Sequence, residues 1–262
     1  MKPNTTDDSI NSVNINTGLD SAITALWPWA IYQNASGGLV HTRNRLGSDR
    51  TPTSTWDVNP LDIKAIRGSR LALAPMLTDF GRISIKGGYA IFYQKSDLKL
   101  AAHITDLDSD KLDPEYPLSW PALPSSITLP ELAPIAAFSV ARADDDRGRV
   151  DTYVLYLDDK ADINVLYTDT LAGRGTEWKT ARPEALRGAD KDTDIACVGM
   201  ATSNHGADTR PLLLGEVSWA TRCYFQRGGE VVEVRLDVDT QAGKWDWVRT
   251  GTVPIPISKP EE

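Results

Sequence analysis

The sequence is poor in the residues that most enzymes and metalloproteins use for chemistry. Its 262 residues include only two cysteines and three histidines. Cys197 and Cys223 lack the spacing of metal ligands, and three scattered histidines argue against a metal site. We expect both cysteines to be buried free thiols in a reducing compartment, although the sequence alone leaves a disulfide between them open. We therefore expect no metal and no cofactor.

Long apolar runs and catalytic fingerprints are missing as well. No stretch approaches the roughly 20 apolar residues of a membrane span, and the polar N-terminus lacks the apolar run of a signal peptide. We therefore expect a cytoplasmic protein. The sequence has no Gly-x-Ser-x-Gly, P-loop or dinucleotide fingerprint, which argues against hydrolases, kinases and dehydrogenases. A net charge of −8 argues against nucleic acid and anionic membranes as partners.

What the chain does contain is aromatic residues and turn formers, with 8 Trp, 8 Tyr and 16 Pro. The clearest pattern is a β-hairpin between Trp219 and Glu233. Tyr224 and Phe225 are strong strand formers, Gly228 and the glycine after it supply the turn, and valines begin the return strand. This composition is typical of short strands joined by turns.

The same hairpin pattern recurs three times upstream. These copies run from Trp29 to His41, from Ala90 to Leu100 and from Tyr153 to Val165. A repeated four-stranded unit predicts an all-β protein with a β-propeller fold. Four blades are visible, and a fifth is open because the last unit has one strand too many. A β-sandwich is the alternative, but it does not explain the repeat.

The domain organisation expected is one propeller over residues 21–262, preceded by a flexible N-terminal tail over residues 1–20. No amphipathic helix is visible. Leu61–Ile66 and Pro183–Leu186 are the candidates for short helical turns.

The pattern Arg-x-Tyr-Phe-Gln, a turn, Val-x-Glu and then Trp resembles the fungal fucose-specific lectins of the Aleuria type. The resemblance is sharpest over Trp219–Pro256. It implies a β-propeller that binds fucose between adjacent blades, with an Arg on the second strand, a Glu on the third and an aromatic ring against the sugar. These roles fall on Arg222 and Glu233, with Trp245 or Trp247 as the ring. The alternative is that Arg222 and Glu233 form only a cross-strand ion pair.

The other three units depart from this pattern. The Arg position holds Trp29, Ala90 and Tyr153, and the Glu position holds His41, Leu100 and Val165. Apolar and aromatic replacements favour a flat apolar ligand over a sugar. In this respect the chain looks similar to the lectin-fold hetero-Diels–Alderases of tropolonic sesquiterpenoid biosynthesis. Those fungal enzymes join a quinone methide to a terpene alkene.

The leading hypothesis from the sequence is therefore a cofactor-free enzyme that orients a quinone methide and an apolar terpene alkene. Arg222, His41 and His103 would be catalytic, donating to the tropolone oxygens. The substrate-binding residues would be Trp29, Tyr153, Trp219, Tyr224, Glu233, Trp245 and Trp247.

Two other hypotheses stay open. The first is a fucose-binding lectin with a single retained site, and the second is a non-catalytic scaffold for protein partners. The partner expected is a small apolar or aromatic substrate, or L-fucose in the lectin case. Neither nucleic acid nor membrane is expected, and a homodimer is left open.

Overall fold

The structure is a computed structural model that describes residues 23–26, 29–45, 55–75, 89–105, 123–141, 150–168, 177–203, 217–239 and 244–254. The expected N-terminal tail over residues 1–20 lies outside the described residues. In the described part, no helix is long and apolar enough to cross a membrane.

Four antiparallel sheets follow one another along the chain, and each is a meander in which consecutive strands pair. We call them blades 1 to 4. Blade 1 holds β1 (Ile23–Leu26), β2 (Trp29–Gln33), β3 (Gly38–Arg45) and β4 (Thr55–Lys64). Blade 2 has three strands, β5 (Ala72–Pro75), β6 (Tyr89–Gln94) and β7 (Leu100–Thr105). Blade 3 holds β8 (Ile135–Ala141), β9 (Val150–Leu157), β10 (Ile163–Thr168) and β11 (Trp178–Ala181). Blade 4 holds β12 (Ala196–Ser203), β13 (Val217–Arg227), β14 (Glu230–Asp239) and β15 (Lys244–Val253).

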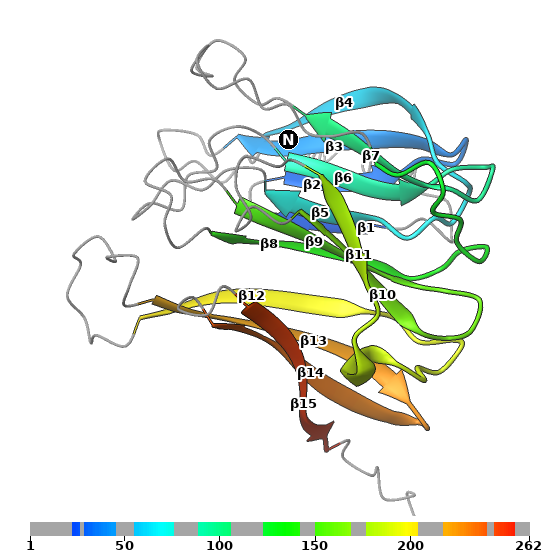
Figure 1. Ribbon diagram of the computed structural model, residues 1–262. Coiled ribbons are helices and arrows are strands. Elements are labelled where there is room, and N and C mark those ends of the chain that lie inside the picture. Colours follow the sequence, from blue (N-terminus) through cyan, green and yellow to red (C-terminus); the bar gives the residue numbers. More distant parts are fainter. Residues whose placement is uncertain are drawn as a thin grey trace, which may run out of the picture.

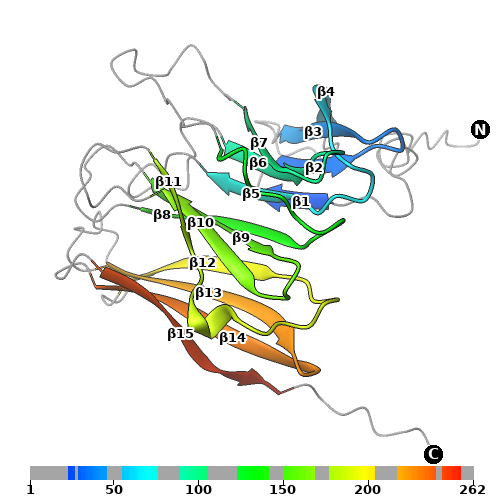
Figure 2. The ribbon, with the colours of Figure 1, turned by 45° about the vertical axis from the view of Figure 1, so that its right-hand side comes forward.

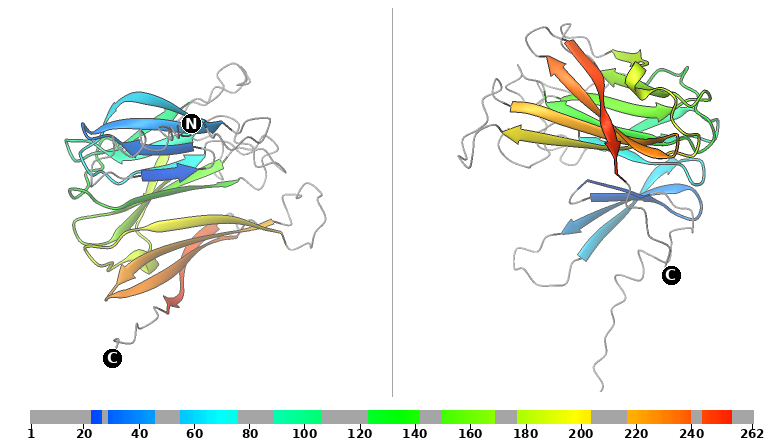
Figure 3. Two further views of the ribbon diagram at one scale, coloured as in Figure 1. Left: turned by 180° about the vertical axis from the view of Figure 1, so that it is seen from behind. Right: turned by 90° about the horizontal axis from the view of Figure 1, so that it is seen from below.

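The blades stack face to face in chain order, from blade 1 at one end to blade 4 at the other (Figures 1 and 2). The view from behind in Figure 3 shows the same order. The first strands β1, β5, β8 and β12 pack on one another in succession. Each of the four hairpin repeats in the sequence therefore forms the second and third strands of one blade, as predicted.

The hairpin turns explain why glycine recurs in the repeat. Between β13 and β14 the chain reverses through Gly228 and Gly229, whose φ angles are 61° and 78°. These left-handed values cost glycine little, and other residues would be strained there. Between β2 and β3, Gly37 has a φ of 84°. The Asn34 side chain there accepts the backbone N–H groups of Ser36 and Gly38 at 3.0 and 2.8 Å.

Three apolar clusters hold neighbouring blades together. Ile31 and Leu39 of blade 1 pack with Tyr89 and Ile91 of blade 2. The other face of β6 carries Phe92, which packs against blade 3. All six residues of β6 are buried, because successive side chains of a strand point to opposite faces and each face meets a blade.

The third cluster lies between blades 3 and 4. Its members from blade 3 include Tyr153 and Leu155, and those from blade 4 include Phe225 and Val232. Blades 2 and 3 are therefore covered on both sides, whereas blades 1 and 4 each have one face that points away from the stack (Figure 2).

A buried glutamine at the end of the second strand ties a blade to the linker that follows it. Gln94 Nε2 donates to the Pro130 carbonyl at 2.7 Å, and its Oε1 accepts the Leu132 N–H at 2.8 Å. Gln33 makes the equivalent contacts, donating to Ile66 O at 2.9 Å and accepting from Gly68 N at 2.8 Å. The repeat thus includes a polar clamp as well as an apolar core.

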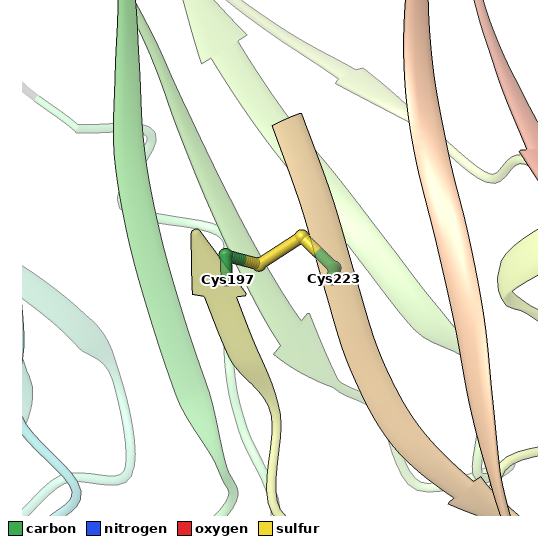
Figure 4. Close-up of a disulfide and its surroundings, with 2 residues drawn as sticks. All are labelled: Cys197 and Cys223. Atoms are coloured by element: carbon green, nitrogen blue, oxygen red, sulfur yellow. A yellow bond between two sulfur atoms is a disulfide. The ribbon is translucent and has the colours of Figure 1, made fainter. Parts of the chain in front are cut away.

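Two sequence expectations need correction. Cys197 and Cys223, which we expected to be free thiols, form a disulfide that joins β12 to β13 (Figure 4). They are directly opposite in the register of these strands, so their side chains meet across the sheet. Disulfides persist in oxidising compartments, which removes the cysteines as an argument for a reducing one.

The other correction concerns Leu61–Ile66, a candidate helical turn. The strand β4 runs through this segment to Lys64, which pairs with Gly38 of β3 after an irregularity in the register. The second candidate is confirmed, since Glu184–Leu186 forms a short 3-10 helix, η2, after Pro183.

The glutamine clamp predicts a clear stability effect. Replacing Gln94 by leucine removes the side-chain partner of the partly buried Pro130 carbonyl and Leu132 N–H, so we expect the free energy of unfolding to fall by about 2 kcal/mol. Gln226 stands at the same point of the repeat in blade 4 but is exposed, so Gln226→Leu serves as the matched control. Urea unfolding measures the free energy of unfolding of both variants. An equal loss in Gln94→Leu and Gln226→Leu would show that the Gln94 hydrogen bonds do not stabilise the fold.

The disulfide predicts that the unfolded, unreduced protein has no titratable thiol and gains two on reduction. The 26-residue separation corresponds to a loss of about 3.5 kcal/mol on removal, in the chain-entropy model. Thermal unfolding of the double variant Cys197→Ser, Cys223→Ser measures this loss. Two free thiols before reduction would contradict the pairing.

Candidate functional site

The outward face of blade 4 carries a row of polar side chains. Strand alternation and register place Arg222 and Tyr224 of β13 on one face with Glu233 and Arg235 of β14. The opposite face of the same strands carries Cys223, Phe225, Val232 and Val234, which belong to the core shared with blade 3. Because blade 4 ends the stack, no other described blade covers the polar row (Figure 1).

Glu233 is the centre of this row. Its Oε1 accepts hydrogen bonds from Arg222 Nη1 and from the Thr250 hydroxyl, the latter at 2.6 Å. Its Oε2 accepts the Tyr224 hydroxyl at 2.9 Å. The side chain of Glu233 is 20% exposed and that of Arg222 is 40% exposed. Three donors from two neighbouring strands therefore fix the carboxylate, while solvent still reaches the pair.

These contacts shift the ionisation of the group. Hydrogen bonds from Thr250 and Tyr224, together with the charge of Arg222, lower the pKa of Glu233, although partial burial acts in the opposite direction. The hydrogen bond to Glu233 raises the pKa of Tyr224. Glu233 is therefore a carboxylate and Tyr224 a neutral donor across the physiological range.

The equivalent positions in the other blades follow from the strand register. Glu233 lies opposite Tyr224, and the residues in that place are His41 in blade 1, Ala102 in blade 2 and Val165 in blade 3. The sequence repeat had put Leu100 there, but Leu100 pairs with Gln94, two residues further along. The predicted equivalence is correct for His41 and Val165 and wrong for Leu100.

Between blades 2 and 3, and between blades 3 and 4, the positions equivalent to Arg222 and Glu233 are part of the apolar core. Tyr153, at the Arg222 position, is 4% exposed. Its ring stacks on Phe138 and on Tyr167, with centroid distances of 5.1 and 6.0 Å. Ala90 and Val165 are fully buried. Apolar side chains here fill the space between blades, so Tyr153 lies within packing and not on an open pocket wall.

The two histidines expected to be catalytic lie far along the stack from Arg222. His41 of β3 is buried at the interface of blades 1 and 2, where its ring meets Tyr89 edge-on at 5.7 Å. His103 of β7 is opposite Ile91 in blade 2, and partial burial lowers its pKa. The three residues thus belong to blades 1, 2 and 4, and the structure does not bring them together.

Of the four tryptophans predicted to bind the ligand, the structure describes the side chain of one. Trp247 is 4% exposed and packs edge-on against Phe138 at 6.2 Å. It therefore lies on the buried face of blade 4, away from Arg222 and Glu233. The backbones of Trp29, Trp219 and Trp245 lie in β2, β13 and β15, while their side chains lie outside the described part.

Thr250, Arg235 and Asp237 were not expected at the site from the sequence. Thr250 reaches Glu233 because the β14–β15 register shifts between Glu233 and Val234, and such an irregularity has no clear signal in a single sequence. Arg235 and Asp237 had a signal, since they follow Glu233 at alternate positions of the same strand. Among the described residues there is no group of three His, Cys, Asp or Glu that could hold a metal ion.

The chain resembles solved structures, a fucose-specific lectin among them. AofleA from Arthrobotrys oligospora matches with a TM-score of 0.60 and 14% identity over 94% of this chain. A fucose-specific lectin from Aleuria aurantia matches with a TM-score of 0.58 and 15% identity over 95% of this chain. An Aleuria aurantia lectin mutant in complex with Fucα1-6GlcNAc matches with a TM-score of 0.56, 15% identity and 95% coverage.

These matches show the fold: the chain is a β-propeller of the fucose-lectin type, as the hairpin repeat predicted. The chain spans 62% of the AofleA structure, 67% of the Aleuria aurantia lectin and 68% of its mutant. No protein-family model matches the chain, and no curated protein does.

The Glu233 cluster predicts a coupled titration. Below the ordinary tyrosine pKa of 10.0 and above the ordinary carboxyl pKa of 4.5, both groups stabilise the fold. The contribution of Glu233 is lost as the pH falls through its lowered pKa, and that of Tyr224 as the pH rises through its raised pKa.

In Glu233→Gln we expect the pKa of Tyr224 to return toward 10.0, because the charged acceptor is gone. Ultraviolet absorbance difference spectra against Tyr224→Phe isolate this one tyrosine. An unchanged Tyr224 titration in Glu233→Gln would show that the hydrogen bond does not form in solution.

Proposed function

We propose that the protein binds a fucose-type saccharide on the outward face of blade 4. The observation that carries the proposal is the hydrogen-bonded group of Arg222, Tyr224 and Glu233 on the second and third strands of the blade. These are the strands on which the resemblance to fucose lectins implies an Arg and a Glu. The structural similarity to the Aleuria aurantia fucose-specific lectin, and to a mutant lectin in complex with Fucα1-6GlcNAc, supports the same conclusion.

The chemistry of the group suits sugar hydroxyls. A guanidinium donates and a carboxylate accepts charge-assisted hydrogen bonds, which are shorter and stronger than neutral ones. Because three donors already hold Glu233 in place, little ordering is needed when a ligand binds. The site is thus preorganised for a polar ligand.

The apolar side of the sugar needs a partner that Trp247 does not provide, since Trp247 is buried on the other face. Tyr224 is half-buried beside Glu233, and Val198 on β12 lies directly opposite Arg222 and is 49% exposed. We assign the apolar contact with the ligand to the Tyr224 ring and Val198.

A single site follows from the packing of the other blades. Because Tyr153, Ala90 and Val165 are buried in the core, the interfaces that blades 2 and 3 make with the next blade hold no Arg–Glu pair. Among the described residues we therefore expect one such site, without the avidity that repeated sites would give.

The experiment is calorimetric titration with L-fucose and with Fucα1-6GlcNAc, followed in parallel by tryptophan fluorescence. We expect saturable binding with a stoichiometry of one. Arg222→Ala should weaken it at least tenfold, since a charged hydrogen-bond donor contributes about 1.5–3 kcal/mol. Arg187 pairs with Glu184 of η2 and makes none of the contacts of the Glu233 group, so Arg187→Ala is the matched control.

Two results would contradict the proposal. One is the absence of binding at millimolar saccharide. The other is binding that Arg222→Ala and Arg187→Ala affect equally.

The second candidate function is the cofactor-free hetero-Diels–Alder step that the sequence favoured. The observation in its favour is a mostly apolar hollow of about 370 Å³ on the outward face of blade 1. Tyr32, Val40, Val58 and Pro60 form its apolar part, with Asn34 and Ser36 at its edge. Such a hollow suits a flat apolar ligand. A cycloaddition adds the alkene to the quinone methide with no leaving group, so orientation alone accelerates it.

This candidate has its own test. The protein and Val58→Glu are each incubated with a tropolonic quinone methide and a humulene-type alkene, and adduct formation and stereochemistry are measured. Faster, stereoselective formation that Val58→Glu abolishes would support an enzyme. A rate and product ratio equal to those without protein would exclude it.

A further inference from the structure

The polar row on blade 4 continues past Glu233 along β14. Arg235 donates to Asp237 through two nitrogens, Nε to Oδ1 and Nη2 to Oδ2, the second at 2.8 Å. The side chains of Arg235 and Asp237 are 39% and 44% exposed. The hydrogen bonds to Asp237 raise the pKa of Arg235. This second ion pair is therefore an oriented, charged feature that solvent reaches.

The two ion pairs are direct neighbours. Arg235 lies opposite Arg222 in the β13–β14 register, so their side chains leave the same face of the sheet side by side. Like charges directly opposite each other are destabilising. Here each arginine has its own carboxylate, Glu233 for Arg222 and Asp237 for Arg235. Asp246 of β15 lies opposite Asp237, so the strip alternates donors and acceptors and carries one carboxylate more than its two arginines.

The equivalent cross-strand pairs in blades 2 and 3 are not polar in this way. Ala90 pairs with Ile104 in blade 2, and Tyr153 pairs with Tyr167 in blade 3. The change from apolar to charged side chains in blade 4 thus includes Arg235, which the resemblance to fucose lectins does not cover.

The length of the strip exceeds one sugar. Glu233, Arg235 and Asp237 occupy alternate positions of an extended strand, so Glu233 and Asp237 are about 13 Å apart along β14. The pair with Asp237 uses two of the five N–H donors of the Arg235 guanidinium. Donors and a carboxylate are therefore available beyond the group around Glu233.

We propose that Arg235 and Asp237 form a second saccharide subsite, so that the preferred ligand is a disaccharide or longer chain lying along β14. This inference rests on the proposed function, with the terminal fucose-type residue held by Arg222 and Glu233. Arg235 donates to hydroxyl or carbonyl oxygens of the second residue, and Asp237 orients Arg235 and accepts from a hydroxyl.

The test compares the dissociation constants of L-fucose and Fucα1-6GlcNAc for the wild type, Arg235→Ala and Asp237→Asn. In wild type we expect the disaccharide to bind about tenfold more tightly than L-fucose, the gain from one or two added hydrogen bonds. In Arg235→Ala the two constants should become equal, while the constant for L-fucose changes less than twofold. In Asp237→Asn the preference for the disaccharide over L-fucose should be smaller than in the wild type. In Arg235→Lys most of this preference should be lost, because lysine lacks the planar guanidinium fork.

Each other outcome overturns the inference in a distinguishable way. Equal weakening of both saccharides in Arg235→Ala would make Arg235 a support for Arg222 and not a subsite. No change for either saccharide would make Arg235 and Asp237 a surface ion pair only. If wild type binds neither saccharide, the proposed function fails together with the subsite. Arg187→Ala is again the control, and thermal unfolding of every variant checks that the fold is intact.

Discussion

The structure depends on the alternation of side chains along each strand, which point in turn to the two faces of the blade. Each face is therefore either packed against a neighbouring blade or points away from the stack. β6 and β9 contribute apolar side chains to a core cluster on each of their two faces because each strand lies between two blades. β13 differs, with Cys223 and Phe225 on one face and Arg222 and Tyr224 on the other. The polar face of β13 and β14 therefore lies at one of the two ends of the stack, where side chains are free of the packing demands that the inner blades impose.

This competition explains why the repeat does not carry a repeated site. A residue at the Arg222 position of an inner blade faces the next blade at close range, and Tyr153 there stacks between two aromatic rings. An unpaired charge in that environment would cost several kcal/mol. Apolar replacement in blades 2 and 3 thus stabilises the stack, and it needs no new ligand to explain it.

Much of the fold was predictable from the sequence because its signals are local. The Gly228–Gly229 turn, the Gly37 turn and the aromatic strands placed all four central hairpins correctly. Arg222 and Glu233 were predictable as a pair through the family resemblance, whereas the contact of the Tyr224 hydroxyl with Glu233 was not. The disulfide, the burial of Trp247 and the contact from Thr250 were not, because they depend on register and on which face of a strand meets a neighbour.

The central claim is that the ligand binds beside Tyr224 on the outward face of blade 4. The most direct measurement is an NMR titration with L-fucose of protein labelled in its tyrosine rings, with Tyr224→Phe used to assign the Tyr224 signal. The account predicts a saturable shift at Tyr224, with the signals of buried Tyr153 and Tyr156 unchanged. A shift at Tyr32, beside the hollow on blade 1, with Tyr224 unchanged would contradict it.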